Sequence, residues 1–231
     1  MNIIITGGSR GIGRETALSL SEDKDNHILI TGRNEPGLKE TAELSVNGNI
    51  EWFVADLAGK ADQMEYLYNR ISSAFSIVDV LINNAGALVN KSFTELNEDE
   101  IRVMMEVNYF TPALLTRRVL PLMKKGSHIL NISSMGGFQG SVKFNGLSCY
   151  SASKAAISSL TECLATELAG TGISVNCLAL GSAQSEMLEE AFPGFKAPVS
   201  AAEIAKFISY FAVNGNRFFN GKILPVALTT P

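Results

Sequence analysis

The first residues whose types and spacing suit a chemical site are the glycines near the start of the chain, between Thr6 and Gly13. The segment Gly7-Gly-Ser-Arg-Gly11 has the form G-x-S-x-G, which in serine hydrolases presents a nucleophilic serine on a sharp turn. The glycines Gly7, Gly11 and Gly13 also suit a turn that offers the N–H groups of a helix N-terminus to a phosphate. Ser9 is a nucleophile in the first interpretation and part of a phosphate site in the second.

The histidines argue against the nucleophile. The hydrolase elbow requires a later acid followed by a histidine, and the chain has only His27 and His128. Both stand at the starts of predicted strands, whereas reactive groups in such sheets gather at the carboxyl ends of the strands. A phosphate site is therefore favoured. Because the spacing G-x-x-x-G-x-G departs from the usual G-x-G-x-x-G, a tight glycine turn without a ligand remains the alternative for this motif alone.

Further motifs follow in order along the chain: Asn83-Asn-Ala-Gly86, Asn108, Asn131-Ile-Ser-Ser134 and Tyr150-Ser-Ala-Ser-Lys154. With the glycine turn, they resemble the short-chain dehydrogenase/reductase family from residue 3 to about residue 213. The resemblance implies a Rossmann-type sheet of seven strands and a nicotinamide cofactor. It also implies a catalytic tetrad of Asn108, Ser134, Tyr150 and Lys154.

The chemistry of the last motif supports this reading. Tyr150 and Lys154 are four residues apart on a predicted helix, so they share one face. A phenol titrates near ~10 in water, and a nearby lysine cation, together with an oxidised nicotinamide, lowers that pKa. Tyr150 can then exchange a proton with a carbonyl oxygen as a general acid or base. The alternative is that Tyr150 and Lys154 lie on the exposed face of an amphipathic helix and have no chemical role.

The other two members of the tetrad take their roles from the resemblance. Ser134 is expected to hydrogen-bond the same substrate oxygen, with Ser133 as the choice if the register differs by one residue. Asn108 is expected to anchor a water that relays protons to Lys154. The alternative for Asn108 is a kink or capping residue, because Pro112 follows it.

The end of the second predicted strand bears on the cofactor. An NAD site usually places an acid about 20 residues past the glycines, and here that position is Gly32. Arg33, with Arg10 as a second cation, can pair with a 2′-phosphate, so we predict NADP(H). A plain surface charge is the alternative for Arg33. The cofactor-binding residues expected from the resemblance are Gly7, Ser9, Arg10, Gly11, Ile12, Gly13, Arg33, Asp56, Leu57, Asn84, Ala85, Gly86, Tyr150, Lys154, Gly181 and Ser185. The family usually has proline where this chain has Leu180.

The substrate is less well defined. Phe138 and Phe144 either wall an apolar pocket or pack their own loop down. Residues 185–200 are predicted to form a short mobile lid whose apolar side chains are Met187, Leu188, Phe192 and Phe195. The chain is thus expected to interconvert a small-molecule carbonyl and an alcohol.

Two alternatives stay open. One is a 3-oxoacyl group on acyl carrier protein, whose docking patch would be Arg117, Arg118, Lys124 and Lys125. The other, from a different functional class, is a regulator that senses NADP without catalysis.

These residues need a scaffold, and the apolar pattern supplies one. Short strands rich in Ile and Val alternate with helices throughout, which predicts a doubly wound, parallel α/β sheet covered on both faces. The strands are expected at 3–6, 27–31, 50–54, 78–82, 128–132, 173–178 and 222–226. The helices are expected near 12–21, 36–45, 60–74, 98–123, 150–169 and 200–213. A chain of 231 residues suits one domain over residues 1–231.

Composition excludes several classes of function. The formal charge is −4 and no basic block stands out, which disfavours nucleic acid. The sequence contains no run of 18 or more apolar residues, so no membrane span is predicted. The three cysteines, Cys149, Cys163 and Cys177, form no C-x-x-C pair, so we expect free thiols and no metal site. A strand that begins at residue 2 or 3 leaves no room for a signal peptide, and a cytoplasmic protein is expected.

A homo-oligomer is expected from the small residues of the helix after Tyr150, among them Ala155, Ala156, Ser158 and Ser159. The tail, 225–231, lacks the Val-Asp-Gly-Gly turn that the family often places at a tetramer contact. The choice between a homodimer and a homotetramer therefore stays open.

Overall fold

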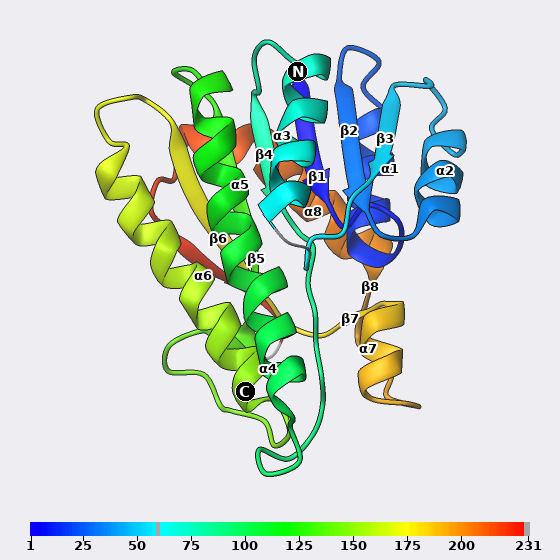
Figure 1. Ribbon diagram of the computed structural model, residues 1–231, viewed down its shortest axis with the longest axis vertical. Helices are drawn as coiled ribbons and strands as arrows, with labels where there is room; N and C mark the ends of the chain where they lie inside the picture. Colours follow the sequence, from blue (N-terminus) through cyan, green and yellow to red (C-terminus); the bar gives the residue numbers. More distant parts are fainter. Residues whose placement is uncertain (59–60, 229–231) are drawn as a thin grey trace.

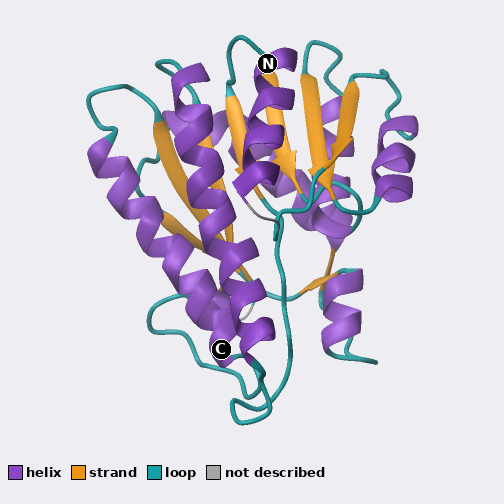
Figure 2. Cartoon of the chain, in the orientation of Figure 1, coloured by secondary structure: helices purple, strands orange, loops and turns teal. Residues whose placement is uncertain are grey.

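A parallel sheet of seven strands forms the centre of the computed structural model, which describes residues 1–58 and 61–228 (Figure 1, Figure 2). The strand order is β3-β2-β1-β4-β5-β6-β9, and every pairing is parallel. The strands are β1 (Asn2–Thr6), β2 (His27–Gly32), β3 (Ile50–Val54), β4 (Val80–Asn83), β5 (His128–Ser134), β6 (Ser174–Leu180) and β9 (Ile223–Val226). The order reverses between β1 and β4, and ligands of such sheets bind at the carboxyl edge beside this point. The predicted doubly wound fold is confirmed.

Helices cover both faces of the sheet. They are α1 (Gly11–Ser21), α2 (Glu35–Glu43), α3 (Ala61–Ala74), α4 (Glu98–Met105), α5 (Thr111–Val119), α6 (Ser148–Glu167), α7 (Glu186–Ala191) and α8 (Ala201–Asn214). Short helical turns occur at η1 (Glu106–Phe110), η2 (Leu120–Leu122), η3 (Met135–Gly137) and η4 (Gly215–Arg217). Residue 60, with which the third predicted helix begins, lies outside the described residues.

The alternation of side chains along the strands separates two cores. Ile3 and Ile5 of β1 pack with residues of α1, α2 and α8 on one face. Ile4, between them, packs with residues of α3 and α5 on the other. All three isoleucines are fully buried. Because the strands are apolar on both faces, as the sequence predicts, the sheet needs helices on both sides. Figure 1 shows α3, α5 and α6 over the near face and α8 over the far face.

The segment predicted as a helix over 98–123 is helical from residue 98 to residue 122, but its hydrogen-bond pattern is not uniform. It is divided into α4, a π-helical turn at η1, α5 and a 3-10 turn at η2. Pro112 has no N–H to donate to the carbonyl of Asn108, four residues earlier, and the N–H of Thr111 reaches back five residues to Glu106. Pro121 lies in η2, past the end of α5. The hydrogen-bond pattern therefore changes around Asn108, one of the predicted site residues.

The segment 185–200 is more ordered in its secondary structure than a loop. Ser185 caps α7 by accepting the N–H of Leu188 at 3.3 Å, and two carboxylates, Glu186 and Glu189, lie in the first helical turn. The segment ends in β8 (Val199–Ser200), which pairs with β7 (Ala183–Gln184). The helix α7 therefore stands as a separate unit below the carboxyl ends of the strands (Figure 1).

The two histidines stand where the sequence places them, at the amino ends of β2 and β5. His27 is exposed, and His128 is fully buried. The Nδ1 of His128 lies 2.8 Å from the carbonyl of Ala212, and Nε2 lies 3.1 Å from the amide of Asn176. Burial lowers the pKa of His128 from 6.5 to about 4, so the ring is neutral. Neither histidine lines the cavity that contains Ser9, which argues against Ser9 as a nucleophile.

Within the described residues, every helix is too short or too polar to cross a bilayer.

Candidate active site

The glycine turn joins β1 to α1 and is closed so tightly that two of its positions require glycine. Gly7 has a φ of +75°, which side-chain-bearing residues rarely adopt. A Cβ on Gly13 would lie 2.1 Å from the carbonyl oxygen of Gly7. The backbone can therefore approach a ligand closely at the start of α1, where unpaired N–H groups and the helix dipole favour an anion. This geometry fits a dinucleotide pyrophosphate.

Thr6 holds a second segment against this turn. Its hydroxyl oxygen accepts the N–H groups of Asn84 and Ala85 at 3.1 and 3.0 Å. The side-chain amide of Asn84 donates in return to the carbonyl of Thr6 at 3.0 Å. Thr6 is absent from the predicted site residues, although it is the last residue of the first strand and begins the glycine motif.

One cavity of about 850 Å³ runs along the carboxyl edge of the sheet and contains most of the predicted site. The predicted residues that line it are Gly7, Ser9, Arg10, Gly11, Ile12, Gly13, Arg33, Leu57, Asn84, Ala85, Gly86, Ser134, Tyr150, Lys154, Gly181 and Ser185. Asp56 and Asn108 do not line it. The exposed Asp56 accepts the N–H of Ala58 at 3.1 Å, and Leu57 and Ala58 form the wall there.

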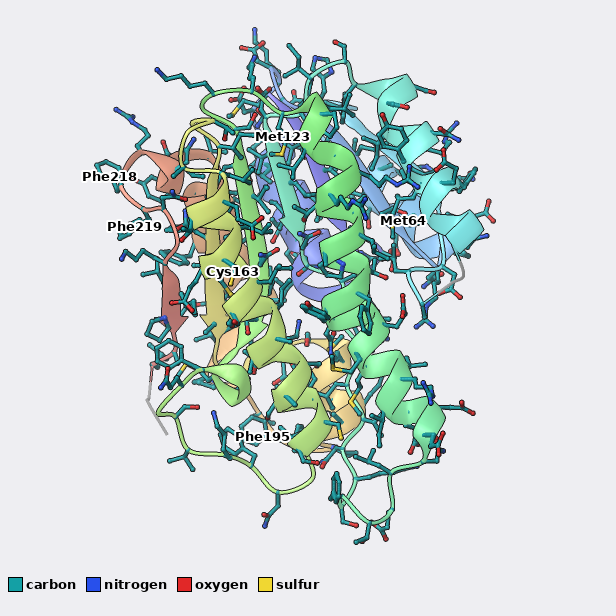
Figure 3. The ribbon with its side chains drawn as sticks, turned by 60° about the vertical axis from the view of Figure 1, so that its left-hand side comes forward. Met64, Met123, Cys163, Phe195, Phe218 and Phe219 are labelled. Carbon is teal, nitrogen blue, oxygen red and sulfur yellow. The ribbon has the colours of Figure 1, made fainter. Side chains whose placement is uncertain are left out.

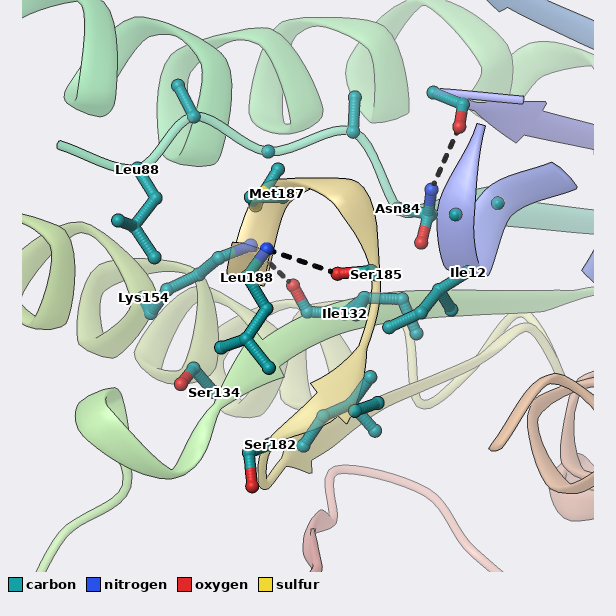
Figure 4. Close-up of a pocket in the computed structure, with 18 of the residues that line it drawn as sticks. Ile12, Asn84, Leu88, Ile132, Ser134, Lys154, Ser182, Ser185, Met187 and Leu188 are labelled. Atoms are coloured by element: carbon teal, nitrogen blue, oxygen red, sulfur yellow. Dashed lines mark hydrogen bonds between the residues drawn. The ribbon is translucent and has the colours of Figure 1, made fainter. Parts of the chain in front are cut away.

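Lys154 is buried beneath the cavity, and its ammonium donates to the carbonyl of Ile132 at 2.9 Å (Figure 4). Burial lowers the pKa of Lys154 to about 8, so the group remains mostly protonated at neutral pH. Burial raises the pKa of Tyr150, and the neighbouring Ser134 hydroxyl offsets this only in part. The direction for Tyr150 is opposite to the sequence expectation, because desolvation of the phenolate outweighs the polar contacts that the protein itself supplies.

The two serines at the end of β5 have separate tasks. Ser133 is buried and donates its hydroxyl proton to the carbonyl of Lys154 at 2.7 Å. The Ser134 oxygen accepts the N–H of Gly136 at 3.1 Å, and its hydroxyl lines the cavity beside Tyr150, whose pKa it lowers. Ser134 is therefore the hydroxyl that can donate to an oxygen in the cavity, which supports the predicted register.

Asn108 lies on the π-helical turn, behind the cavity wall. Its side-chain oxygen accepts the N–H of Ala87 at 2.9 Å, and its amide donates to the carbonyl of Ala87 and to the Ser153 hydroxyl. A Cβ on Gly86 would lie 3.4 Å from this oxygen and 3.6 Å from the Lys154 nitrogen. Asn108 thus holds the loop after β4 beside Lys154, at the kink that the sequence offers as the alternative role.

The adenosine end of the cavity carries the two predicted cations. Gly32, the last residue of β2, occupies the place of the expected acid, and the exposed Arg33 and Asn34 follow it on the cavity wall. Arg10 also lines the cavity, but its guanidinium forms an ion pair with Glu190 of α7. That hydrogen-bonded pair holds the pKa of Glu190 below its ordinary value.

The other end of the cavity is apolar. All four apolar side chains of the predicted lid, Met187, Leu188, Phe192 and Phe195, line it. Phe144 lines it too, whereas Phe138 does not, so the two loop phenylalanines have different roles. Figure 4 shows Leu188 and Met187 above Lys154, and Figure 3 shows Phe195 at the end of the molecule below the strands. Sequence reasoning missed further wall residues, including Leu88, Leu147, Ala227 and Leu228.

Comparison with known proteins adds independent information. The family model for short chain dehydrogenase matches residues 1–194. An uncharacterized oxidoreductase of Staphylococcus epidermidis is 31% identical over 209 residues, which cover 90% of this chain and 88% of that protein. A 3-oxoacyl-[acyl-carrier-protein] reductase of Synechocystis is 31% identical and covers 80% of this chain and 75% of its own length.

Among solved structures, a short chain dehydrogenase from Burkholderia cenocepacia in complex with NADP superimposes with a TM-score of 0.87. It is 26% identical and covers 97% of this chain and 95% of its own. The strand order, the glycine turn and these relatives agree, and the chain is an oxidoreductase of the short-chain dehydrogenase/reductase family.

Proposed function

We propose that this protein interconverts a carbonyl compound and an alcohol with NADP(H), and that Tyr150 is its general acid and base. The observation that carries the proposal is the presence of Ser134, Tyr150 and Lys154 in the same cavity as the glycine turn. A nicotinamide cofactor bound there supplies the hydride to the carbonyl carbon or accepts it from the alcohol.

The chain's own residues then handle the proton. Tyr150 gives its proton to the carbonyl oxygen in reduction and takes one from the alcohol in oxidation. Ser134 donates a hydrogen bond to the same oxygen and orients it. The Lys154 ammonium, fixed on the Ile132 carbonyl, stabilises the phenolate form of Tyr150.

The preference for NADP(H) is supported by charge at the adenosine end. Gly32 offers no carboxylate to repel a 2′-phosphate, and Arg10 and Arg33 both line the cavity. The NADP complex of the similar Burkholderia cenocepacia protein supports the same choice. Replacing Arg33 by Ala should weaken NADPH binding more than NADH binding. An unchanged preference would contradict this role.

An apolar, uncharged substrate fits the far end of the cavity best. Among the described residues, the charged side chains that line the cavity are Arg10, Arg33, Glu186 and Lys154. The first three lie at the phosphate and adenosine side, and Lys154 takes part in the proposed proton transfer. The substrate end is lined instead by residues such as Leu88, Phe144 and Phe195. A free ketone or aldehyde of small to medium size therefore suits this end without a charge to pair.

A 3-oxoacyl group on acyl carrier protein is the second candidate substrate, favoured by the similar Synechocystis reductase. The predicted docking residues give it little support. Arg118 pairs with Glu65 at 3.1 Å, and Lys124 pairs with Asp79 at 3.6 Å. Lys124 and Lys125 also precede β5, at the edge of the sheet opposite the cavity.

The test follows NADPH consumption with acetoacetyl thioester beside a panel of simple ketones and aldehydes. We expect turnover of the simple carbonyls, a weaker rate with NADH and a loss of at least ~10²-fold in Tyr150→Phe with NADPH still bound. Tyr66→Phe, on the exposed face of α3, is the matched control.

Other results would change the proposal. Turnover of the thioester alone would favour the carrier-linked substrate. Tight NADPH binding with no turnover of any compound would favour a regulator that senses NADP. Equal rates for wild type and Tyr150→Phe would exclude Tyr150 as the acid and base.

A further inference from the structure

The lid helix α7 is attached to the phosphate-binding turn by an ion pair that the proposed function does not use. Glu190 of α7 contacts both terminal nitrogens of the Arg10 guanidinium, Nη1 with Oε1 and Nη2 with Oε2, the latter at 3.0 Å. The two residues are 180 positions apart in the sequence. Both side chains are partly exposed, 44% for Arg10 and 60% for Glu190, so solvent and ligands can reach the pair.

The acidic face of α7 points at the glycine turn. Glu186 is one helical turn before Glu190, and a Cβ on Gly11 would lie 3.1 Å from its Oε2. Residues four apart share a helix face, so both carboxylates face the glycine turn, Glu186 beside Gly11 and Glu190 on Arg10. Glu189 is directed elsewhere, because it accepts the N–H of Gly194 at 3.0 Å and a contact from Gln184 at 3.4 Å.

A carboxylate and a phosphate group compete for the same guanidinium. Both form paired hydrogen bonds with its planar fork, and their like charges repel at close range. Arg10 is one of the two cations that line the adenosine end in the described residues. A 2′-phosphate that engages Arg10 must therefore take the place of Glu190.

We propose that Glu190 is a determinant of cofactor specificity: its carboxylate competes with the 2′-phosphate of NADP(H) for Arg10, and binding of that phosphate releases α7 from the glycine turn. The inference rests on the proposed function through the choice of cofactor. As a consequence, a cofactor with a 2′-phosphate breaks the ion pair between α7 and the glycine turn. A cofactor without a 2′-phosphate leaves this ion pair in place. A second contact holds α7 in either state, since the Asn90 amide donates a hydrogen bond to the carbonyl of Ala191 at 2.9 Å.

Binding of nucleotide fragments tests the competition without any turnover. The probes are adenosine 2′,5′-bisphosphate, which carries the 2′-phosphate, and adenosine 5′-monophosphate, which lacks it. By calorimetry at low ionic strength, Glu190→Gln should bind the bisphosphate about two- to five-fold more tightly than wild type, the range expected for an exposed ion pair. Its affinity for the monophosphate should be unchanged. Glu189→Gln, the matched control on the same helix, should bind both probes as wild type does.

The release of α7 has its own readout in amide hydrogen exchange. In wild type, the bisphosphate should speed exchange in residues 186–195 and the monophosphate should not. In Glu190→Gln the amides of these residues should exchange faster than in wild type before any ligand is added. Adding the bisphosphate should then change their exchange rates little. Slower exchange of α7 in wild type on adding the bisphosphate would overturn the proposal, because Arg10 would then hold phosphate and Glu190 together.

The two proposals fail in different ways. If wild type binds the bisphosphate no better than the monophosphate, both the preference for NADP(H) and the competition are overturned. If wild type prefers the bisphosphate, but Glu190→Gln gains affinity equally for both probes or gains none, the competition alone is overturned.

Discussion

Asn108 donates a hydrogen bond from its side-chain amide to the hydroxyl of Ser153, 2.9 Å away, and Ser153 in turn donates to the backbone carbonyl of Tyr150 at 2.7 Å. The relationship ties the π-helical turn to the first turn of α6, which carries the proposed acid and base. The same Asn108 side chain satisfies both backbone groups of Ala87. Asn108 therefore sets the distance between the loop after β4 and the helix that carries Tyr150.

The first prediction separates these two tasks. Asn108→Ala removes two hydrogen bonds to the half-buried backbone groups of Ala87, each worth ~0.5–1.5 kcal/mol, so stability in urea should fall by ~1–3 kcal/mol. Ser153→Ala cuts only the connection to Tyr150 and should lower kcat with a smaller loss of stability. Equal losses of stability in the two variants would contradict the division.

The second prediction compares the adjacent serines of β5. Ser134→Ala removes the hydroxyl that lines the cavity beside Tyr150 and should lower kcat by ~10²–10³-fold while stability stays within ~0.5 kcal/mol. Ser133→Ala removes the hydrogen bond to the Lys154 carbonyl and should cost ~1 kcal/mol of stability, with kcat changed only a few-fold. Steady-state kinetics and urea unfolding of both variants provide the check. A reversed pattern would shift the catalytic role to Ser133.

The third prediction concerns acid stability. The folded pKa of His128 is about 4, below its ordinary value of 6.5. The unfolded chain therefore binds a proton that the folded chain does not, and this contribution to stability is complete above pH 6.5 and is lost as the pH falls toward 4. The loss amounts to about 3 kcal/mol.

Urea unfolding between pH 7 and pH 4 measures this loss. His128→Gln should be less stable at pH 7 but should show a shallower decline, since the titrating group is gone. His27→Gln, at the exposed start of β2, should follow the wild-type curve. The same slope in His128→Gln and wild type would exclude His128 as the cause.

The fourth prediction uses the contact between the turn after β6 and the tail. A Cβ on Gly181 would lie 2.7 Å from the Cβ of Ala227, while nothing lies within 4 Å of one on Gly170. Gly181→Ala should therefore cost ~1–3 kcal/mol through overpacking and should raise KM, because both residues line the cavity. Adding Ala227→Gly should restore most of the loss, and Gly170→Ala should have no effect. Thermal unfolding and KM values for these three variants and wild type decide this, and no rescue by Ala227→Gly would refute the contact.

The fifth prediction concerns assembly. Ala155 and Ser159 are exposed on α6, near the exposed Cys163 that Figure 3 shows, whereas Ser158 is buried and bonds to the Lys154 carbonyl at 3.0 Å. We expect a homo-oligomer that packs through this face, and Ser159→Arg should lower its mass in light scattering. Ser72→Arg, on the exposed part of α3, should leave the mass unchanged. A monomeric wild type would refute the assembly.

The fold class and most of the residues that line the cavity could be predicted from the amino-acid sequence alone. Alternating short apolar strands and helices require a doubly wound sheet, because strands that are apolar on both faces must be covered twice. The glycine turn was readable since only glycine permits its φ at Gly7 and its close approach at Gly13. Tyr150 and Lys154 were readable because a helix places residues four apart on one face.

Features that depend on contacts between distant segments could be read from the three-dimensional structure alone. The tasks of Ser133 and Ser134 follow from which of the two reaches Lys154, 21 positions later in the sequence. The pairing of Arg10 with Glu190 joins two positions that no local pattern connects. Local periodicity is fixed by backbone geometry along the chain, whereas partners across 180 residues are fixed by packing of the whole sheet.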